Sequence, residues 1–499
     1  MAKINSQTLQ EKVVKGSFIA IFFSLFGAIF AYLIKVLYSR TLPVEHFGIF
    51  YAVFGFIILV STYTELGFGE AMSYFIPKHL KNKRYKDLLN ILIYGQVIQV
   101  GIAIILAIII AVFAPFLATE YFKVAGAKYL LYIFCIFLVL VSILNSLLQI
   151  FTGLQKEKYY SSIYIIRMGI IFLLSMIFLM IHLNNVFYYG LAWVLGYLFT
   201  ALIFIYLLWN NHPYLNVKDL TWNKNLFNDL RNYALPAFTT TFIYTLFTSS
   251  DIFFLTLIRG VKDVGVYSLI VPIAAISLIF LAPLNNVLLP LTSHLMEGEK
   301  DKLGFLISKI YQVVPFIGIY FALFIIMFPS AVVGLIFGEK WLGPTQIPLT
   351  YLSLGYIALL MSNILGIITL GTGKIKERLK ILFFVTILNI IMHAILIYYF
   401  GILGAVITNS FTAIILILLY TKILRNTIFF TIPYLFYLEL LSFTVLSFLL
   451  VKLTHFSPNS WLEFLLSGAI YTGVFSLLGF ILKIYDKKLI SLIIPQRSK

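Results

Sequence analysis

Long apolar runs constrain this chain more than any other feature of its sequence. A bilayer core about 30 Å thick needs about 20 apolar residues in helical form. Fourteen such runs lie between residues 16 and 482. The chain is 61% hydrophobic and only 11% charged, which excludes a soluble domain. The sequence therefore predicts an all-α polytopic membrane protein with about 14 transmembrane helices.

The basic charge follows this topology. The chain has 36 Lys and Arg against 19 Asp and Glu, a net charge of +17. With the N-terminus in the cytoplasm, 27 basic residues fall on cytoplasmic segments, 7 on external segments and 2, Lys35 and Arg167, within spans. We therefore expect a multi-pass protein of the cell (inner) membrane with both termini cytoplasmic. The basic loops are expected to bind anionic membrane lipids, and no nucleic acid is expected as a partner.

An internal repeat organises the chain. The segment "LPVEHFGIF" at 42–50 matches "RGVKDVGVY" at 259–267, and "GLQKEK" at 153–158 aligns with "GTGKIK" at 371–376. The offsets are 217 and 218 residues. Six spans per repeat give both halves the same orientation in the membrane. The predicted parts are an N-terminal six-helix lobe at 1–208, a cytoplasmic linker at 209–232, a C-terminal six-helix lobe at 233–424, and two further spans with a basic cytoplasmic tail at 425–499.

Catalytic signatures are missing from the sequence. The linker, with roughly 24 residues, is too short for a catalytic domain, and no Asp-x-Asp, Gly-x-x-x-x-Gly-Lys or Gly-x-Ser-x-Gly pattern occurs. The lone Cys135 excludes a thiolate metal cluster. We expect no enzyme activity, no metal and no cofactor, with H⁺ or Na⁺ coupling left open.

Several segments together resemble a known family. They are "TELGFGEAMSYFIPKHL" at the end of the second span, "GLQKEKYY" after the fourth, and "SSDIFFLTLIRGVKDVGVYSLIVPI" across the seventh and eighth. With the six-plus-six-plus-two arrangement, they are similar to Wzx-type polysaccharide flippases, whose superfamily includes the multidrug and toxin extrusion (MATE) exporters and peptidoglycan-precursor flippases. The resemblance implies two six-helix bundles around a cavity that opens alternately to either side. It also implies a polyprenyl-diphosphate-linked glycan as cargo, with polysaccharide-assembly proteins as further partners.

Charged residues within spans are candidate functional groups, because each is costly in hydrocarbon. The candidates are Lys35, Glu65, Glu70, Arg167, Asp251 and Glu439. Arg167 lies too deep in the fifth span to reach water easily, and its planar donors suit a diphosphate. An ion pair with Glu65 is the alternative. Glu70 is expected to be an interface residue, and Glu439 has no assigned role.

Lys35 and Asp251 occupy nearly equivalent places in spans one and seven, because Lys35 aligns with Ile252. They could latch the two lobes on the external side until substrate phosphate engages the lysine. Alternatively, Lys35 reaches outward toward Arg40, and the polar patch "TSSD" at 248–251 holds a proton or Na⁺. The predicted substrate pathway comprises Arg167, Lys35, Asp251 and Glu65.

Uncharged polar residues within spans form a second group. They lie in spans four, ten and eleven, where such side chains more often join helices than bind ligands. The cavity candidates are Asn145, Gln149, Asn363, Asn389 and His393.

Three functions compete. The leading one is a flippase that moves a lipid-linked oligosaccharide to the outer leaflet for surface polysaccharide such as O-antigen. A MATE-like cation-coupled exporter is the alternative, although it would favour an acidic cavity and twelve spans. A non-transporting scaffold is disfavoured by the charges within the spans.

Overall fold

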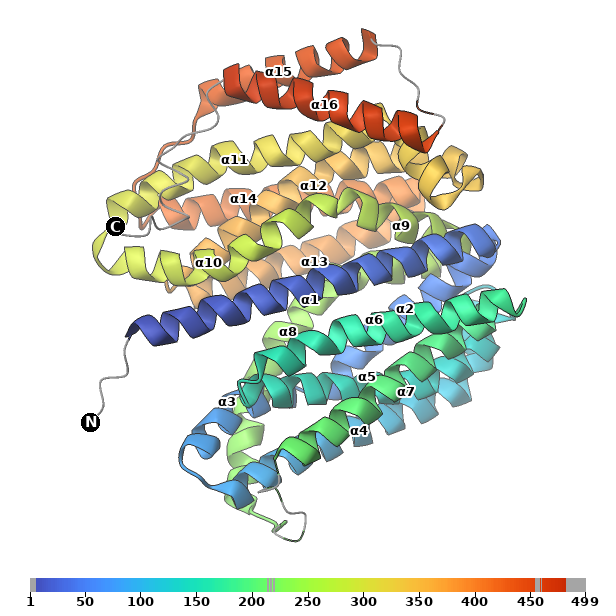
Figure 1. Ribbon diagram of the computed structural model, residues 1–499, viewed down its shortest axis with the longest axis vertical. Helices are drawn as coiled ribbons and strands as arrows, with labels where there is room; N and C mark the ends of the chain where they lie inside the picture. Colours follow the sequence, from blue (N-terminus) through green and yellow to red (C-terminus); the bar gives the residue numbers. More distant parts are fainter. Residues whose placement is uncertain are drawn as a thin grey trace. The chain divides into compact units, whose positions relative to one another are not determined.

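A computed structural model describes residues 6–212, 215, 218, 220–453, 458 and 460–481. Every regular element in these residues is a helix (Figure 1). Twelve helices are long and apolar enough to cross a membrane, and two shorter apolar helices follow at 434–450 and 461–477. The predicted all-α polytopic fold is therefore confirmed. The predicted basic C-terminal tail lies within 482–499, outside the described residues.

The chain forms two compact units, Met1–Gly265 and Val266–Lys499. The first unit contains α1 (Ser6–Thr41), α2 (Val44–Glu65), α3 (Phe68–Lys81), α4 (Tyr85–Phe116), η1 (Leu117–Tyr121), α5 (Ala127–Gly153), α6 (Glu157–Met180), α7 (Val186–Asn211) and α8 (Lys224–Arg259). Helix α9 (Val261–Ala274) crosses the boundary. The second unit continues with α10 (Ile276–Gly298), α11 (Lys300–Met327), η3 (Ala331–Leu335), η4 (Glu339–Trp341), α12 (Leu342–Gly371), α13 (Ile375–Phe400), α14 (Ile402–Arg425), α15 (Tyr434–Leu453) and α16 (Trp461–Ile481).

Helix α8 belongs by its contacts to the first unit, where it packs on α2 and α3. Two residues of α4 fix the chain where it enters α8. The side chain of Asn90 accepts from the backbone N–H of Thr221 at 3.2 Å, and the Tyr94 hydroxyl donates to the Thr221 carbonyl at 2.9 Å. Asn223 then caps α8 by accepting from the N–H of Leu226 at 3.1 Å. The lobe division at the linker 209–232 stays a prediction.

Two predicted spans are interrupted in the structure. The second, predicted at 47–70, divides into α2 and α3, because Leu66 and Gly67 have φ of 42° and 77° and reverse the local backbone twist. The eighth, predicted at 264–290, divides at Ala275 between α9 and α10. A Cβ on Gly67 would lie 1.9 Å from the Ala234 carbonyl oxygen of α8. The first break therefore lets the backbone of α8 approach closely.

The predicted repeat appears in two matching turns. Helices α5 and α12 end at Gly153 and Gly371, and one residue of positive φ follows in each turn, Gln155 at 55° and Gly373 at 79°. Helices α6 and α13 then start at Glu157 and Ile375, which are 218 residues apart. This common geometry at one offset is what a duplication requires.

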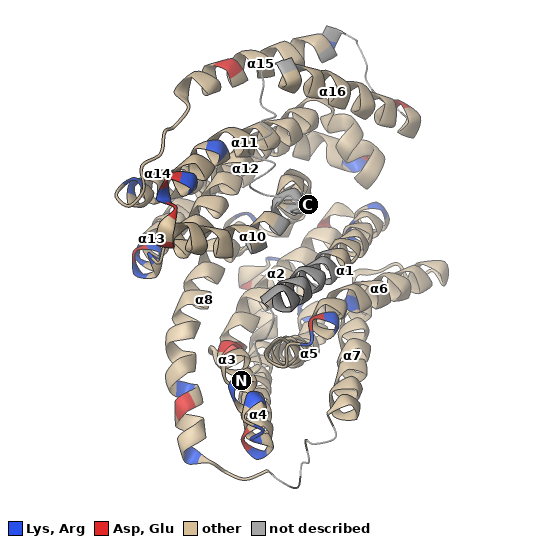
Figure 2. Ribbon diagram, turned by 60° about the vertical axis from the view of Figure 1, so that its left-hand side comes forward, with Lys and Arg blue, Asp and Glu red and all other residues tan. Residues whose placement is uncertain are grey.

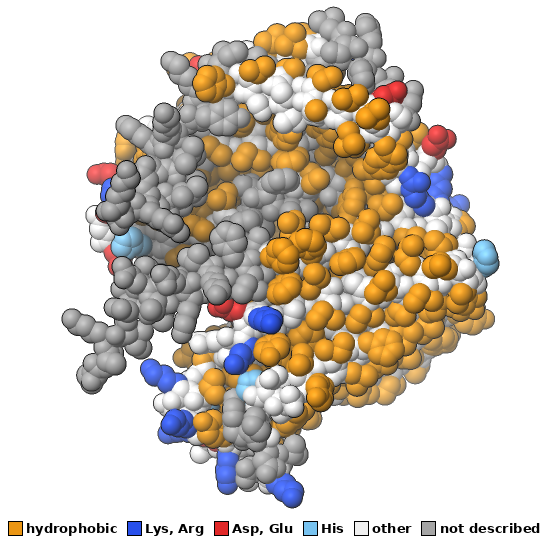
Figure 3. All heavy atoms as spheres, in the orientation of Figure 1, with side chains coloured by type: hydrophobic (Ala, Val, Ile, Leu, Met, Phe, Trp, Pro, Cys, Tyr) orange, Lys and Arg blue, Asp and Glu red, His pale blue; other side chains and the backbone are white. Residues whose placement is uncertain are grey.

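The exposed faces of the helices suit lipid. In Figure 2 the charged residues gather toward helix ends, as around the α3–α4 turn, and long middle stretches carry none. Figure 3 shows hydrophobic side chains covering the face over α6 and α7, where Leu173, Met180, Leu202 and Tyr206 are among the exposed residues. Such continuous apolar faces are typical of helices in contact with hydrocarbon.

Candidate functional site

An acidic cluster lies at the break between α2 and α3. Glu65 is the last residue of α2, and its Oε1 accepts a hydrogen bond from Asn145 Nδ2 of α5 at 2.8 Å. Gln149, one turn further along α5, accepts from the Ser73 hydroxyl of α3 at 2.6 Å. The structure therefore brings Glu65, Asn145 and Gln149 together, three residues singled out in the sequence.

Glu70 completes this cluster from the first turn of α3. Its Oε1 accepts from the Thr241 hydroxyl of α8 at 2.8 Å, while its Oε2 is buried and has no hydrogen-bond partner. The carboxyl groups of Glu65 and Glu70 are close enough to interact electrostatically. Two carboxyl groups confined among apolar helices favour a shared proton or a bound cation, because like charges repel most strongly where water is scarce. We call this group the acidic cluster; its members are Glu65, Glu70, Ser73, Asn145, Gln149 and Thr241.

Arg167 lies against aromatic rings. Its guanidinium carbon is 4.7 Å from the ring centroid of Tyr197 on α7 and 5.5 Å from that of Tyr164 on its own helix. Its Nε is buried and has no hydrogen-bond partner. No ion pair joins Arg167 to Glu65, so the alternative considered for this arginine is absent. Stacking on ring faces leaves the planar edge of the guanidinium available to an anion.

Lys35 and Asp251 both lie in the first unit, on α1 and α8. The ammonium of Lys35 is 4.4 Å from the ring centroid of Tyr51 on α2. Asp251 Oδ1 accepts from the backbone N–H of Ile252 at 2.7 Å, and the Ile252 side chain packs at Gly55 of α2. Both side chains are therefore oriented toward α2, and the latch between them stays a prediction.

The other predicted polar residues divide into two kinds. Asn363 donates to the Leu359 carbonyl of its own helix at 3.2 Å and is exposed. Asn389 and His393 are fully buried in the second unit, where Asn389 Nδ2 donates to the Thr412 hydroxyl of α14 at 3.2 Å. Asn389 therefore joins helices α13 and α14.

A cavity of about 350 Å³ lies among α11, α12, α14 and α15 of the second unit. Its lining is largely aliphatic, with Tyr311 and Tyr437 among its residues. The Tyr437 hydroxyl donates to the Tyr311 backbone carbonyl at 2.9 Å and so ties α15 to α11. An apolar cavity of this size suits part of a lipid chain.

Sequence reasoning missed two features. Arg378 was read as part of a basic surface run, although the structure buries its Nε between helices. Glu70 was assigned to an interface, and its place beside Glu65 depends on the backbone reversal at Leu66 and Gly67. The residue spacing alone carried no signal for either, because both depend on how separate helices pack.

Comparison with known proteins places the chain in a family. The family described as polysaccharide biosynthesis protein matches residues 13–296. An uncharacterized membrane protein of Methanocaldococcus jannaschii is 26% identical over 508 residues, covering 98% of this chain and 99% of that protein. The capsular polysaccharide biosynthesis protein CapF of Staphylococcus aureus is 25% identical over 290 residues, covering 56% of this chain and 72% of that protein.

Solved structures share the fold. The lipid II flippase MurJ in an inward closed conformation has a TM-score of 0.74 at 15% identity, covering 93% of this chain and 98% of that one. An inward-facing multidrug resistance MATE transporter of the MOP superfamily has a TM-score of 0.70 at 16% identity, covering 82% and 98%. At these identities the likeness establishes the fold alone.

Proposed function

Because the chain belongs to the polysaccharide biosynthesis protein family, we propose that it is a flippase for a polyprenyl-diphosphate-linked oligosaccharide. It moves this cargo from the cytoplasmic to the outer leaflet of the cell membrane by alternating access, with both of its termini in the cytoplasm. The work is binding and release, and no covalent bond is made or broken. The flippase fold shared with MurJ supports this proposal.

The observation that carries the proposal is the environment of Arg167. A permanently charged guanidinium lies ten residues into α6, about 15 Å along the helix. It stacks on Tyr197 and Tyr164, has no carboxylate partner, and keeps an unpaired Nε. Such a group gains most from an anion with several acceptor oxygens, and a diphosphate matches its planar donors.

The apolar cavity of the second unit fits the other end of the same cargo. Its volume of about 350 Å³ and its largely aliphatic lining suit a segment of a polyprenyl chain. The hydroxyl of Tyr437 is already engaged with the Tyr311 carbonyl, so it adds little polarity to the cavity. The prenyl chain then stays in apolar surroundings while the diphosphate is held elsewhere.

The acidic cluster favours the second candidate, a MATE-like exporter coupled to H⁺ or Na⁺. Two interacting carboxyl groups and two side-chain amides provide oxygen ligands for a cation or acceptors for a proton. The two candidates differ in the charge of the transported molecule. An anionic cargo requires Arg167, whereas a cationic cargo requires the carboxylates of Glu65 and Glu70.

The deciding experiment compares charge variants in proteoliposomes that contain a fluorescent polyprenyl-diphosphate oligosaccharide. Arg167→Gln is expected to slow flipping at least about tenfold, and Arg167→Lys is expected to recover only part of the rate, because a point charge lacks the bidentate geometry. Lys158→Gln, at an exposed position on the same helix, is the matched control and should flip at the wild-type rate.

The opposite pattern would favour the exporter. In that case Arg167→Gln would flip normally or the wild type would not flip at all, and Glu65→Gln would abolish efflux of a cationic dye. Protein amount and insertion must match the wild type in both assays.

A further inference from the structure

Arg378 lies on the second turn of α13, but its guanidinium is turned into the second unit. A Cβ built on Gly366 of α12 would lie 3.7 Å from Arg378 Nε and 3.3 Å from Cε2 of Tyr420 on α14. Helices α12, α13 and α14 pack on one another here. The arginine therefore occupies the space that the missing side chain of Gly366 leaves, beside the ring of Tyr420.

This guanidinium has no anionic partner in the described part of the chain. Its Nε is buried without a hydrogen-bond acceptor. Tyr420 is the polar group that interacts with it, and it is neutral. Helices α12 and α14 end close by, at Gly371 and Arg425, and their terminal carbonyls carry only partial negative charge. Arginine has five donors and does not deprotonate, so the site retains a full positive charge.

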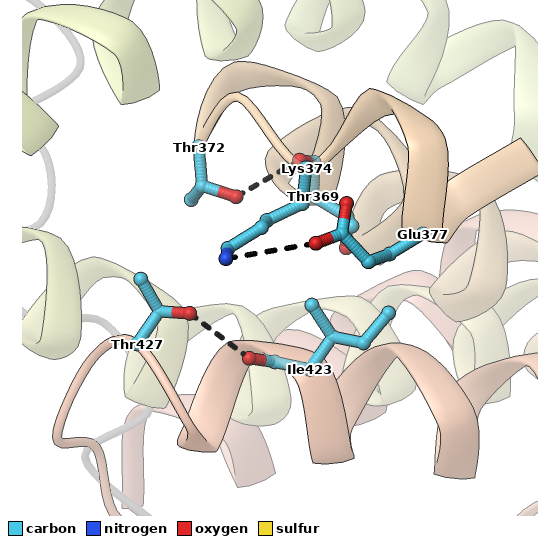
Figure 4. A network of polar contacts seen from close by, with 6 residues as sticks. All are labelled: Thr369, Thr372, Lys374, Glu377, Ile423 and Thr427. Atoms are coloured by element: carbon cyan, nitrogen blue, oxygen red, sulfur yellow. Dashed lines mark hydrogen bonds and ion pairs between the residues drawn. The ribbon is translucent and has the colours of Figure 1, made fainter.

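Lys374 adds a second cation on the same face. It precedes Arg378 by four residues, and side chains spaced in this way lie above one another on a helix. Figure 4 shows its amine extending into the space between Thr372 and Thr427, 3.7 Å from Glu377 Oε1. Both threonine hydroxyls donate to backbone carbonyls of their own segments, at 2.8 and 3.2 Å. The donors left for an anion are therefore those of the lysine and the arginine.

The first unit has a parallel arrangement. Helices α6 and α13 begin 218 residues apart after matching turns, and each presents one arginine to a tyrosine of the following helix. The pairs are Arg167 with Tyr197 and Arg378 with Tyr420, and both arginines have a buried, unpaired Nε. Arg378 is the fourth residue of its helix and Arg167 the eleventh of its own, a difference of about 10 Å along the axis.

We infer that Arg378, with Lys374 and Tyr420, forms a second phosphate-binding site for a membrane lipid. Gly366 lies five residues, about 8 Å, from the end of α12, which places the guanidinium near the depth of lipid head groups rather than in bulk water. The ligand is a phosphate or diphosphate monoanion or dianion carried by a lipid. It is either the diphosphate of the proposed cargo or the head group of an anionic phospholipid. The first source rests on the proposed function, and the second does not.

The test measures binding to the full-length protein in nanodiscs. In one arm, fluorescent farnesyl diphosphate is titrated in neutral phosphatidylcholine. In the other arm, contact of spin-labelled phosphatidylglycerol with the protein is measured without the prenyl probe. The variants are R378Q and R378K, and the matched control is K376Q, which removes an exposed charge two residues away.

R378Q is expected to weaken one of these two interactions about tenfold, with a smaller loss for R378K and no change for K376Q. Loss of farnesyl diphosphate binding identifies the cargo diphosphate, and loss of phosphatidylglycerol contact identifies the phospholipid head group. The inference is overturned if R378Q changes neither interaction, or if K376Q weakens binding as much as R378Q does, which would indicate diffuse surface charge.

A second variant keeps the test valid if R378Q fails to fold. G366A retains the arginine but adds a methyl group 3.3 Å from Tyr420 and 3.7 Å from Arg378 Nε, so it narrows the site. It should weaken the same interaction, and wild-type binding by a folded G366A and by R378K would refute the site. Normal results for Arg378 variants together with slow flipping by Arg167→Gln would reject this inference and leave the proposed function intact.

Discussion

Replacing Gly67 by alanine tests how the break between α2 and α3 positions the acidic cluster. Gly67 has φ of 77°, a conformation that costs an L-residue about 1–2 kcal/mol. The added Cβ would also lie 1.9 Å from the Ala234 carbonyl oxygen and 2.9 Å from the Phe238 nitrogen of α8. Overpacking of this kind typically costs about 1–3 kcal/mol. Together the two effects predict a loss of about 2–5 kcal/mol in the free energy of unfolding.

Two other glycines separate these contributions. Gly373 has φ of 79° but no heavy atom within 4 Å of a built Cβ, so Gly373→Ala measures the conformational cost alone. Gly48 has no positive φ, but its Cβ would lie 2.1 Å from the Val261 carbonyl oxygen, so Gly48→Ala measures crowding alone. The thermal midpoint in detergent should fall most for Gly67→Ala and less for each of the other two.

Transport should follow the geometry as well as the stability. To relieve the clash at Gly67, α8 must move away from α3, which lengthens the 2.8 Å bond from Thr241 to Glu70. Gly67→Ala is therefore expected to slow flipping in the folded fraction, and Gly373→Ala is not. Equal thermal midpoints for Gly67→Ala and Gly373→Ala would show that the close approach of α8 contributes nothing, and the reasoning would be wrong.

Three further predictions concern side chains within spans. Asn145→Leu leaves a carboxylate oxygen of the acidic cluster without its donor, so it should lower stability by about 1–3 kcal/mol and impair transport, whereas Asn363→Leu, whose amide bonds only to its own helix, should do neither; equal effects would contradict the cluster. If Lys35 and Asp251 form a latch, Lys35→Met and Asp251→Asn should reduce transport similarly and the double variant should be no worse, while additive losses would exclude the latch. In a variant lacking the native cysteine, cysteines introduced at 339–342 should react with reagent added outside and those in the α3–α4 turn should not; the reverse labelling would invert the topology.

Hydropathy was sufficient for the number and course of the spans, because burial in lipid requires long apolar helices whatever their neighbours. It could not locate the break in the second span. The residues from 57 to 68 remain largely apolar, and hydropathy does not report the sign of φ at Leu66. The consequence reaches beyond one helix end. The reversal there starts α3 with Glu70 close enough to Glu65 for the carboxyl groups to interact, whereas an unbroken helix would have fixed their relative orientation by the helical period.

The candidate residues were found by type, and their partners were not. Depth counting suggested that Arg167 and Glu65 could pair, but each has a different neutral partner in the structure. The same method counted Arg378 as a surface residue, because it follows a run of lysines at the start of a helix. Its side chain extends toward α12 only because Gly366 leaves room, and contacts between distant helices are not encoded in local spacing.

The choice of neutral partners bears on the kind of protein this is. A charge at the centre of a span costs on the order of 3 kcal/mol, and a static scaffold would reduce that cost most simply by pairing Glu65 with an arginine. In the first unit the two signs are instead kept apart: an amide holds Glu65, and aromatic rings hold Arg167. Each charge is positioned by groups that do not neutralise it, so each can attract a mobile ion of the opposite sign. That separation is expected in a transporter that binds an anion at one place and a cation at another, and it explains why changes to the two sites should have distinguishable effects on flipping.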